Sequence, residues 1–293
     1  MKITKIAAGL AAAAVFALSA VSAGAEAAEE AQPAGYVSFT AIKSTIGQGF
    51  TVEPVQVPFY EGENGLDVVK RAVDTQYSES DYGPFITGLA DDGEDEVTLP
   101  DAIAEVVAET TGRTAEGYLS SMDYTAESGW TYFVNGEYAQ VGIGDYTPAD
   151  GDVLEFEFTV YGYGADLGVD NSSWGGAAAL KEMPNKAKLI ALCAAEPDAT
   201  KDSFEFVAAM ETLAIWESTQ EDIDNAVEAL SSDVRTEFPD DDEIANEPVD
   251  DADDTTDTTV PDKTAPDTGV EGMAVVLGAA VLACGALALA KRK

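Results

Sequence analysis

The chain has 293 residues and a formal net charge of −40, with 55 acidic residues, 15 basic residues and no histidine. So acidic a surface repels nucleic acid and anionic lipid, and the sequence therefore predicts neither as a partner. Without histidine, Ser-His-Asp and Cys-His catalysis are excluded, and the commonest metal ligand is missing. Cys193 and Cys284 lie in apolar segments that cannot meet in a mature secreted protein, so we expect no disulfide within the chain.

The N-terminus has the pattern of a secretory signal peptide. Lys2 and Lys5 form a basic start, and residues 6–20 form an apolar run. Small residues at 21–25 offer a cleavage site. We therefore predict that residues 1–25 are a signal peptide and that the mature chain lies outside the cell.

The first predicted domain covers residues 35–168 and begins with strand-forming residues. We expect strands at 36–42 and at 52–59. The second of these contains two prolines, which cannot donate to the hydrogen-bond ladder of a sheet, and this favours an edge strand. Asn64 and Gly65 then open a helix, because the apolar residues after them recur at helical spacing.

Residues 91–112 form an acidic insertion, for which we predict a helix from Pro100 to near Gly112. The start of the insertion offers oxygen ligands of the kind that Ca²⁺ prefers, at Asp91, Asp92, Glu94, Asp95 and Glu96. The spacing is not that of a calcium-binding loop. A solvated turn is therefore the favoured interpretation, and we predict no metal site.

A tight hairpin is the clearest local signal. Strand-forming residues at 130–134 and 137–141 flank Asn135 and Gly136. An Asn-Gly pair supplies the two positive φ angles that a type I′ turn requires. Further on, residues 152–161 alternate strictly, with Leu154, Phe156, Phe158 and Val160 on one face and Glu155, Glu157 and Thr159 on the other. This alternation predicts a sheet with one buried face and one solvent-exposed face.

These residues resemble a known family. The stretch 129–136, Tyr146, the Asp-Gly-Asp at 150–152, the helix opening at 65–69 and the strand at 117–121 are similar to the transcobalamin C-terminal-like domain of unknown function found on bacterial surface proteins. The resemblance implies a β-grasp-like sheet with a packed helix. It also implies a ligand-binding role, with a corrinoid as a possible ligand, by analogy with the cobalamin carriers.

Aromatic residues near the strand ends are the candidate ligand contacts, namely Trp130, Tyr132, Tyr138, Tyr161 and Tyr163. Aromatic faces bind corrins, sugars and prolines alike. The alternative is that these side chains are core residues or cross-strand pairs. If they bind a ligand, we expect Trp130, Tyr161 and Tyr163 to gather around one apolar recess.

A second predicted domain at 185–236 has helical periodicity. We expect helices at 186–194 and 204–215, and a third that begins with a capping box of Ser218 and Glu221. The third helix resembles the last helix of FIVAR modules, three-helix bundles of Gram-positive surface proteins. The sequence therefore predicts a small three-helix bundle with a core of its own, serving as a spacer.

The C-terminal part has the order of a surface anchor. Residues 237–264 are an acidic stalk, with too few apolar residues to offset chain entropy, so we expect disorder. The motif Ala265, Pro266, Asp267, Thr268, Gly269 then precedes an apolar run at 273–290 and a basic tail. Residues 265–293 resemble the cell-wall sorting signal of Gram-positive proteins, which implies cleavage by a sortase after Thr268, although the usual motif begins with Leu. A plain single-pass membrane anchor, with its basic tail in the cytoplasm, is the alternative.

The sequence therefore predicts an α+β protein anchored to the cell wall, with a β-grasp module that binds a corrinoid, a glycan or a peptide. Its other partners would be the sortase, the wall and, before processing, the membrane. A structural or adhesive stalk without a small-molecule site is the alternative. We predict neither a resident cofactor nor an enzyme, because catalysis would depend on carboxylates alone, and no pair is placed for it.

Overall fold

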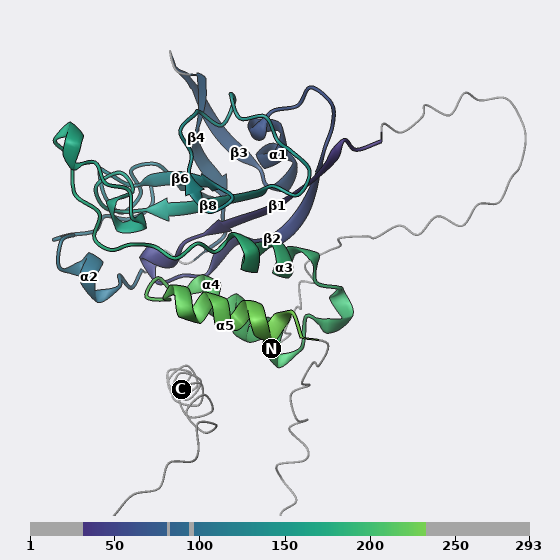
Figure 1. Cartoon of the computed structure of the whole chain (residues 1–293). Helices are drawn as coiled ribbons and strands as arrows, with labels where there is room; N and C mark the ends of the chain where they lie inside the picture. Colours follow the sequence, from purple (N-terminus) through teal and green to yellow (C-terminus); the bar gives the residue numbers. More distant parts are fainter. Residues whose placement is uncertain (1–31, 81–82, 94–96, 233–293) are drawn as a thin grey trace, which may run out of the picture. The chain divides into compact units, whose positions relative to one another are not determined.

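The computed structural model describes residues 32–80, 83–93 and 97–232, which all belong to one compact unit (Figure 1). The predicted α+β class is confirmed. The strands are β1 (Gly35–Ile42), β2 (Phe50–Phe59), β3 (Thr75–Ser80), β4 (Gly83–Ala90), β5 (Tyr118–Ser120), β6 (Gly129–Val134), β7 (Glu137–Tyr138) and β8 (Val153–Thr159). The α-helices are α1 (Gly65–Ala72), α2 (Asp101–Ala104), α3 (Ala187–Ala195), α4 (Phe204–Ala214) and α5 (Gln220–Leu230). Short 3-10 turns lie at Ser44–Ile46, Ala165–Leu167, Ser172–Trp174 and Asp198–Thr200.

The larger sheet has the strand order β2-β1-β8-β6-β7. Strand β1 pairs antiparallel with β2 and parallel with β8, and β6 pairs antiparallel with both β8 and β7. Strand β2 lies at the edge, as its two prolines predicted. Strands β3, β4 and β5 form a smaller antiparallel sheet. No sequence pattern had predicted β3 or β4.

The first face of the larger sheet is apolar and packs against α1 and the smaller sheet. Phe39 and Phe156 of neighbouring strands are buried there with Val69 of α1, and residues of β4 join the same cluster. Helix α1 begins where the sequence predicted, because Asn64 and Asp67 form a reciprocal capping box. This face is the core of the module.

The second face of the larger sheet is covered by helical residues, so the predicted solvent-exposed face is wrong. Glu155 and Glu157 of β8 lie on it and are only 3% and 4% exposed. Helix α3 contacts β1, β2 and β8, and Lys186, which precedes it, is buried against both glutamates. Alternation along a strand shows which residues share a face, but it does not show what covers that face.

Helices α3, α4 and α5 pack on one another beside the larger sheet (Figure 1). Their apolar cluster includes Leu189, Phe206 and Ile223, but also Val153 of β8 and the half-buried Phe50 of β2. The three predicted helices do pack on one another, but the prediction that they have a core of their own is wrong. Three helices of about ten residues bury little apolar surface alone, and the sheet supplies the rest.

The hairpin is confirmed at its turn. Asn135 and Gly136 have φ angles of 54° and 80°, as a type I′ turn requires. Its second strand, β7, is shorter than predicted and ends at Tyr138 rather than at residue 141.

Helix α2 is a single turn, so the predicted helix extending to Gly112 is wrong. The backbone N–H of Thr111 donates to the carbonyl of Tyr124 at 2.7 Å, and that of Tyr124 donates to Gly112 at 3.4 Å. These bonds to a distant loop replace the bonds that a continuing helix would make.

The capping box of α5 lies one residue later than predicted. Thr219 and Asp222 form it, not Ser218 and Glu221. The hydroxyl of Ser218 donates instead to the carbonyl of Thr212 at 2.7 Å, which ties the end of α4 to the start of α5. Both pairs fit the sequence pattern of a capping box, and the loop between the helices selects one.

The predicted signal peptide (1–25), acidic stalk (237–264) and sorting signal (265–293), with its apolar run at 273–290, lie outside the described residues. Among the residues that the structure does describe, no helix has the length and apolar character needed to cross a bilayer.

Candidate functional site

Two of the five candidate aromatic residues are partly buried and pack against the core of the sheet. The Trp130 ring lies edge-on to Phe158, with centroids 5.3 Å apart, and its Nε1–H donates to the carbonyl of Leu119 at 2.8 Å. The Tyr132 ring stacks on Phe156 at 5.4 Å, and burial raises the pKa of its hydroxyl to about 12. Both side chains have the packing role that the sequence analysis gave as the alternative.

The other three aromatic residues are at least partly exposed. Tyr163 is 67% exposed with a φ of 53°, and Tyr161 is half-buried. Neither they nor Trp130 line either of two hollows that flank the hairpin. Tyr138 does line one of them, with its ring edge-on to that of Phe133 at a centroid distance of 6.0 Å.

The first hollow, which we call the glutamate cleft, has a volume of about 210 Å³ and lies over the second face of the sheet. Its wall is formed by the hairpin, β8 and two loops, with Phe133, Gly136, Tyr138, Glu155, Glu157, Leu167, Gly168, Val169, Glu182, Met183 and Pro184. Two acidic residues at the bottom of a partly apolar cleft are unusual, because an unpaired buried charge is costly.

Lys186 compensates these acids. Its Nζ lies 2.5 Å from Glu157 Oε1 and 3.7 Å from Glu155 Oε1, and all three side chains are at most 5% exposed. Burial is the largest cause that raises the pKa of Glu155 well above its usual range, and the negative charge of the neighbouring Glu157 is the second. A protonated Glu155 can donate to Glu157 Oε2, which is buried without another partner. The cluster then carries no net charge.

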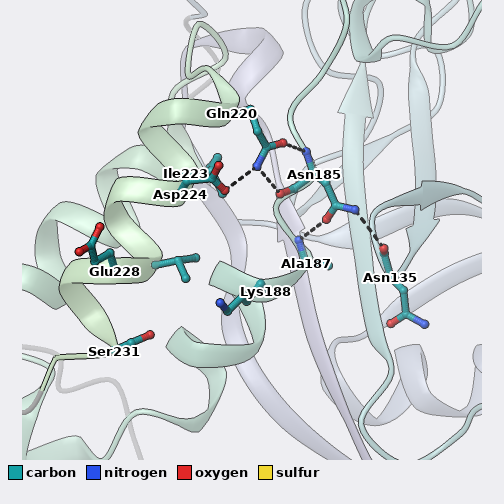
Figure 2. A pocket seen from close by; sticks show the side chains of 10 residues that line it. Asn135, Asn185, Ala187, Lys188, Gln220, Ile223, Asp224, Glu228 and Ser231 are labelled. Atoms are coloured by element: carbon teal, nitrogen blue, oxygen red, sulfur yellow. Dashed lines mark hydrogen bonds between the residues drawn. The ribbon is translucent and has the colours of Figure 1, made fainter.

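The second hollow, which we call the amide groove, has a volume of about 680 Å³ and lies between the hairpin turn, α3 and α5 (Figure 2). It is lined by Asn135, Asn185, Ala187, Lys188, Gln220, Ile223, Asp224, Val227, Glu228 and Ser231. None of these ten residues was predicted as a ligand contact.

Three amide residues tie the groove together (Figure 2). The backbone N–H of Asn185 donates to Gln220 Oε1 at 2.8 Å, and Asn185 Nδ2 donates to the carbonyl of Asn135 at 3.3 Å. Gln220 Nε2 also donates to Asp224 Oδ1 at 3.0 Å. The groove thus has a fixed wall built from three segments that are distant in sequence.

The rim of the groove carries uncommitted polar groups. Lys188, Glu228 and Ser231 are exposed, and their side chains make no hydrogen bond or ion pair within the part of the chain that the structure describes. Beneath them Ile223 and Val227 form an aliphatic floor and are only 1% and 8% exposed. An apolar floor with free donors and acceptors on its rim is the usual form of a binding site.

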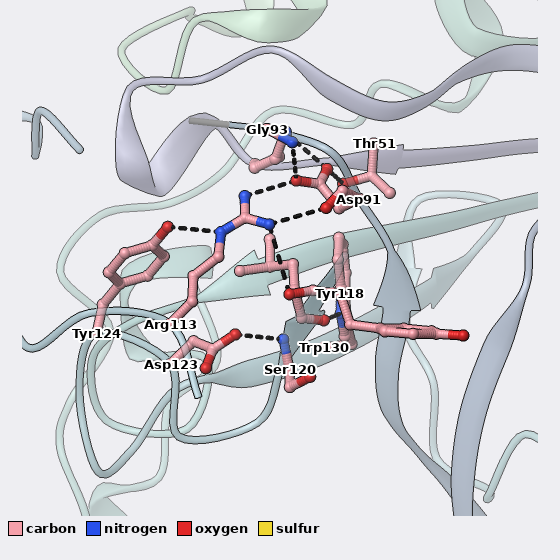
Figure 3. Close-up of polar contacts among 11 residues, drawn as sticks. Thr51, Asp91, Gly93, Arg113, Tyr118, Ser120, Asp123, Tyr124 and Trp130 are labelled. Atoms are coloured by element: carbon pink, nitrogen blue, oxygen red, sulfur yellow. Dashed lines mark hydrogen bonds and ion pairs between the residues drawn. The ribbon is translucent and has the colours of Figure 1, made fainter. Parts of the chain in front are cut away.

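The acidic insertion begins with a buried ion network rather than a solvated turn (Figure 3). Asp91 accepts from Lys43 Nζ and Thr51 Oγ1 at 2.6 Å and from Arg113 Nη2 at 2.6 Å. The N–H of Gly93 donates to Asp91 Oδ1 at 2.9 Å. The solvated-turn prediction is therefore wrong for Asp91, and both of its carboxylate oxygens are already occupied.

This network is structural. Burial alone would raise the pKa of Asp91, but the hydrogen bonds from Lys43, Thr51 and Arg113 outweigh it and lower that pKa to about 2. The network joins the ends of β1 and β4 to the loop before β5. Within the described ranges, no group of three or more His, Cys, Asp or Glu residues could hold a metal ion.

Comparison with known proteins gives a partial family match. Residues 103–160 match the family model of a domain of unknown function (DUF4430), and this range contains Trp130, the Asn-Gly turn and the Asp-Gly-Asp on which the predicted resemblance rests. The matched range is less than half of the chain. No curated protein matches the chain.

Two solved structures show similarity at low TM-scores. One is haptocorrin in complex with Cbi, at 17% identity and a TM-score of 0.29, over 43% of this chain and 25% of the haptocorrin chain. The other is a candidate metal-binding protein from Ruminococcus gnavus ATCC 29149, at 17% identity and a TM-score of 0.24, over 43% of this chain and 97% of that chain. Scores this low carry no argument about the site.

Proposed function

We propose that the described part of the chain is a ligand-binding module and that the amide groove takes an extended peptide segment. The observation that supports this most is the set of free polar groups on the groove's rim, Lys188, Glu228 and Ser231, above an aliphatic floor. A peptide offers backbone amides, both signs of charge and aliphatic side chains, so it matches every part of this lining.

The composition of the groove favours a peptide over a corrinoid or a glycan. None of its ten lining residues is aromatic. Planar rings and sugar faces are usually bound by stacking on aromatic side chains, whereas Trp130 and Tyr132 pack against Phe158 and Phe156 and do not line the groove. A corrinoid is the alternative that the transcobalamin-like resemblance of the sequence implies, and the test includes it.

We place this module on the cell surface. The sequence patterns that predict a signal peptide at residues 1–25 and a sorting signal at 265–293 support export followed by covalent attachment to the cell wall. The acidic stalk between the module and the wall would extend by self-repulsion and hold the groove away from the wall. In this proposal the protein is a wall-anchored binding protein, with the three helices forming part of the binding module.

The test is a binding screen on the full chain, with a phage-displayed peptide library, a glycan array and cobalamin as separate arms. We expect peptides to be enriched, and enriched peptides to bind Lys188→Gln and Glu228→Gln at least about tenfold more weakly. Glu221→Gln is the matched control, because Glu221 is exposed on the same helix but does not line the groove. Peptides that bind all three variants equally, or binding of cobalamin or glycans alone, would exclude the groove as a peptide site.

A further inference from the structure

Lys186 lies against the two glutamates that line the glutamate cleft, so that an amine and two carboxyl groups meet largely removed from solvent. Lys186 is 1% exposed, and its Nζ lies 2.5 Å from Glu157 Oε1 and 3.7 Å from Glu155 Oε1. Lys186 precedes α3, whereas both glutamates lie on β8, so the contact joins the helical part of the chain to the sheet. None of the three residues lines the amide groove.

This arrangement meets the geometric needs of an amide condensation. An amine held against a carboxyl group reacts as one molecule, with the large advantage of fixed proximity. A solvent-poor site also removes much of the hydration that stabilises separate ammonium and carboxylate ions. A second carboxyl group, Glu155, lies within reach of the amine and can accept and return a proton.

We propose that Lys186 and Glu157 condense within the folded chain to a side-chain amide, with Glu155 carrying the proton between them. Lys186 Nζ first passes one proton to Glu157, which leaves a neutral amine beside a neutral acid. The amine then attacks Glu157 Cδ, so that an N–C bond forms. Glu155 gives its proton to the hydroxyl oxygen of Glu157, the C–O bond to that oxygen breaks, and the oxygen leaves as water. Glu155 then takes one proton from the new amide nitrogen and ends in its starting state. The balance needs no oxidant, activating group or other reagent.

The glutamate cleft gives the released water a way out, because Glu155 and Glu157 line it directly. Amides hydrolyse slowly at neutral pH, so the link persists once the water has left. The product is a covalent link between β8 and the residue before α3, across the sheet–helix junction. This inference does not depend on the proposed peptide ligand.

A second buried lysine–carboxylate contact provides a natural control. Lys43 Nζ lies 2.6 Å from Asp91 Oδ2, and both side chains are at most 5% exposed. Here Arg113 adds a second positive charge and Thr51 a further donor to the carboxylate, and together they keep it ionised, whereas Glu157 faces one cation and a neighbouring carboxyl group that can exchange a proton with it. We therefore expect a link at Lys186 and none at Lys43.

The test is mass spectrometry of the full chain purified in its folded state and then denatured. We expect an intact mass lower by one water than the sequence requires, and a branched proteolytic peptide that joins Lys186 to Glu157. Lys186→Arg should restore the full mass, Glu155→Gln should slow the loss of water, and Lys43→Arg should leave it unchanged.

The unaltered protein alone decides the question, so a variant that fails to fold does not leave it open. A full intact mass after prolonged incubation of the folded protein would overturn the proposal. A missing water that peptide mapping assigns elsewhere, such as to a cyclised aspartate, would overturn it as well. Unlike the peptide screen, this measurement is independent of any ligand, so the two proposals can fail separately.

Discussion

Replacing Gly136 by alanine should destabilise the sheet and the helices together. Gly136 has a φ of 80°, and a Cβ at this position would overlap the carboxamide of Asn185. That carboxamide donates to the carbonyl of Asn135 at 3.3 Å and accepts from the N–H of Ala187 at 3.0 Å. The side chain of Asn185 can rotate away, but only by losing both bonds.

The magnitude is the sum of two contributions. A non-glycine residue in the left-handed region costs about 1–2 kcal/mol. The two bonds of Asn185 are exposed, so water replaces much of each, and their loss adds about 1 kcal/mol together. The expected loss in the free energy of unfolding for Gly136→Ala is therefore about 2–3 kcal/mol.

Gly151→Ala is the matched control. Gly151 has a φ of 87°, but nothing lies within 4 Å of an added Cβ, so only the backbone strain applies. Urea unfolding, followed by helical circular dichroism and by tryptophan fluorescence, measures both variants. Equal losses in the two variants would show that contact with Asn185 contributes nothing. Helical and tryptophan signals that unfold at different urea concentrations would show that helices and sheet are independent units.

Three further results are expected. Asp91→Asn should lower the free energy of unfolding by about 3 kcal/mol, because it leaves Lys43 and Arg113 without their counter-charge. The Asp91 pKa falls from 3.8 to about 2 on folding, so the unaltered protein should lose this stability as pH falls through that range. In urea unfolding, the free energy of unfolding of the variant should therefore depend less on pH in this acid range. Because the pKa of Glu155 is raised on folding, its pH dependence is the opposite of that of Asp91. The contribution of Glu155 to the free energy of unfolding is complete below about pH 4.5 and is lost as pH rises through the folded-state pKa. Glu155→Gln should remove that loss when urea unfolding is measured over a series of pH values. Thr268→Ala should leave the protein extractable from cells by detergent, and an unaltered protein that is itself fully extractable would refute covalent attachment to the wall.

The features that the sequence predicted correctly are those that a few adjacent residues decide. Asn135 and Gly136 determine their turn by their own φ preferences, and Asn64 and Asp67 determine the start of α1 by capping. The two prolines of β2 restrict that strand to an edge wherever the sheet forms. Such signals do not depend on the rest of the fold.

The features that the sequence did not predict depend on contacts between distant residues. Glu155 and Glu157 would show the same sequence alternation on a solvent-exposed face and on a face covered by a helix. The buried position follows from the contact with Lys186, which is 29 residues from Glu157 in the sequence. A lysine just before an apolar helix was the one available signal, and it is a weak one. The amide groove likewise forms only where Asn135, Asn185 and Gln220 are in contact, and no local sequence pattern predicts these contacts.

The short segment before α3 is the point where these observations converge. Asn185 bonds to the hairpin and to α5, and the next residue, Lys186, bonds to β8. This segment borders both hollows, with Asn185 lining the amide groove and Pro184 lining the glutamate cleft. A ligand in the groove would therefore contact the same residues that hold the helices to the sheet. A ligand that binds only the folded state stabilises that state by its binding free energy. Peptide binding should therefore stabilise the packing of the helices on the sheet, and that packing should in turn favour peptide binding. A covalent link at Lys186 would fix one side of this junction, so that the groove keeps its shape when force acts on the anchored chain.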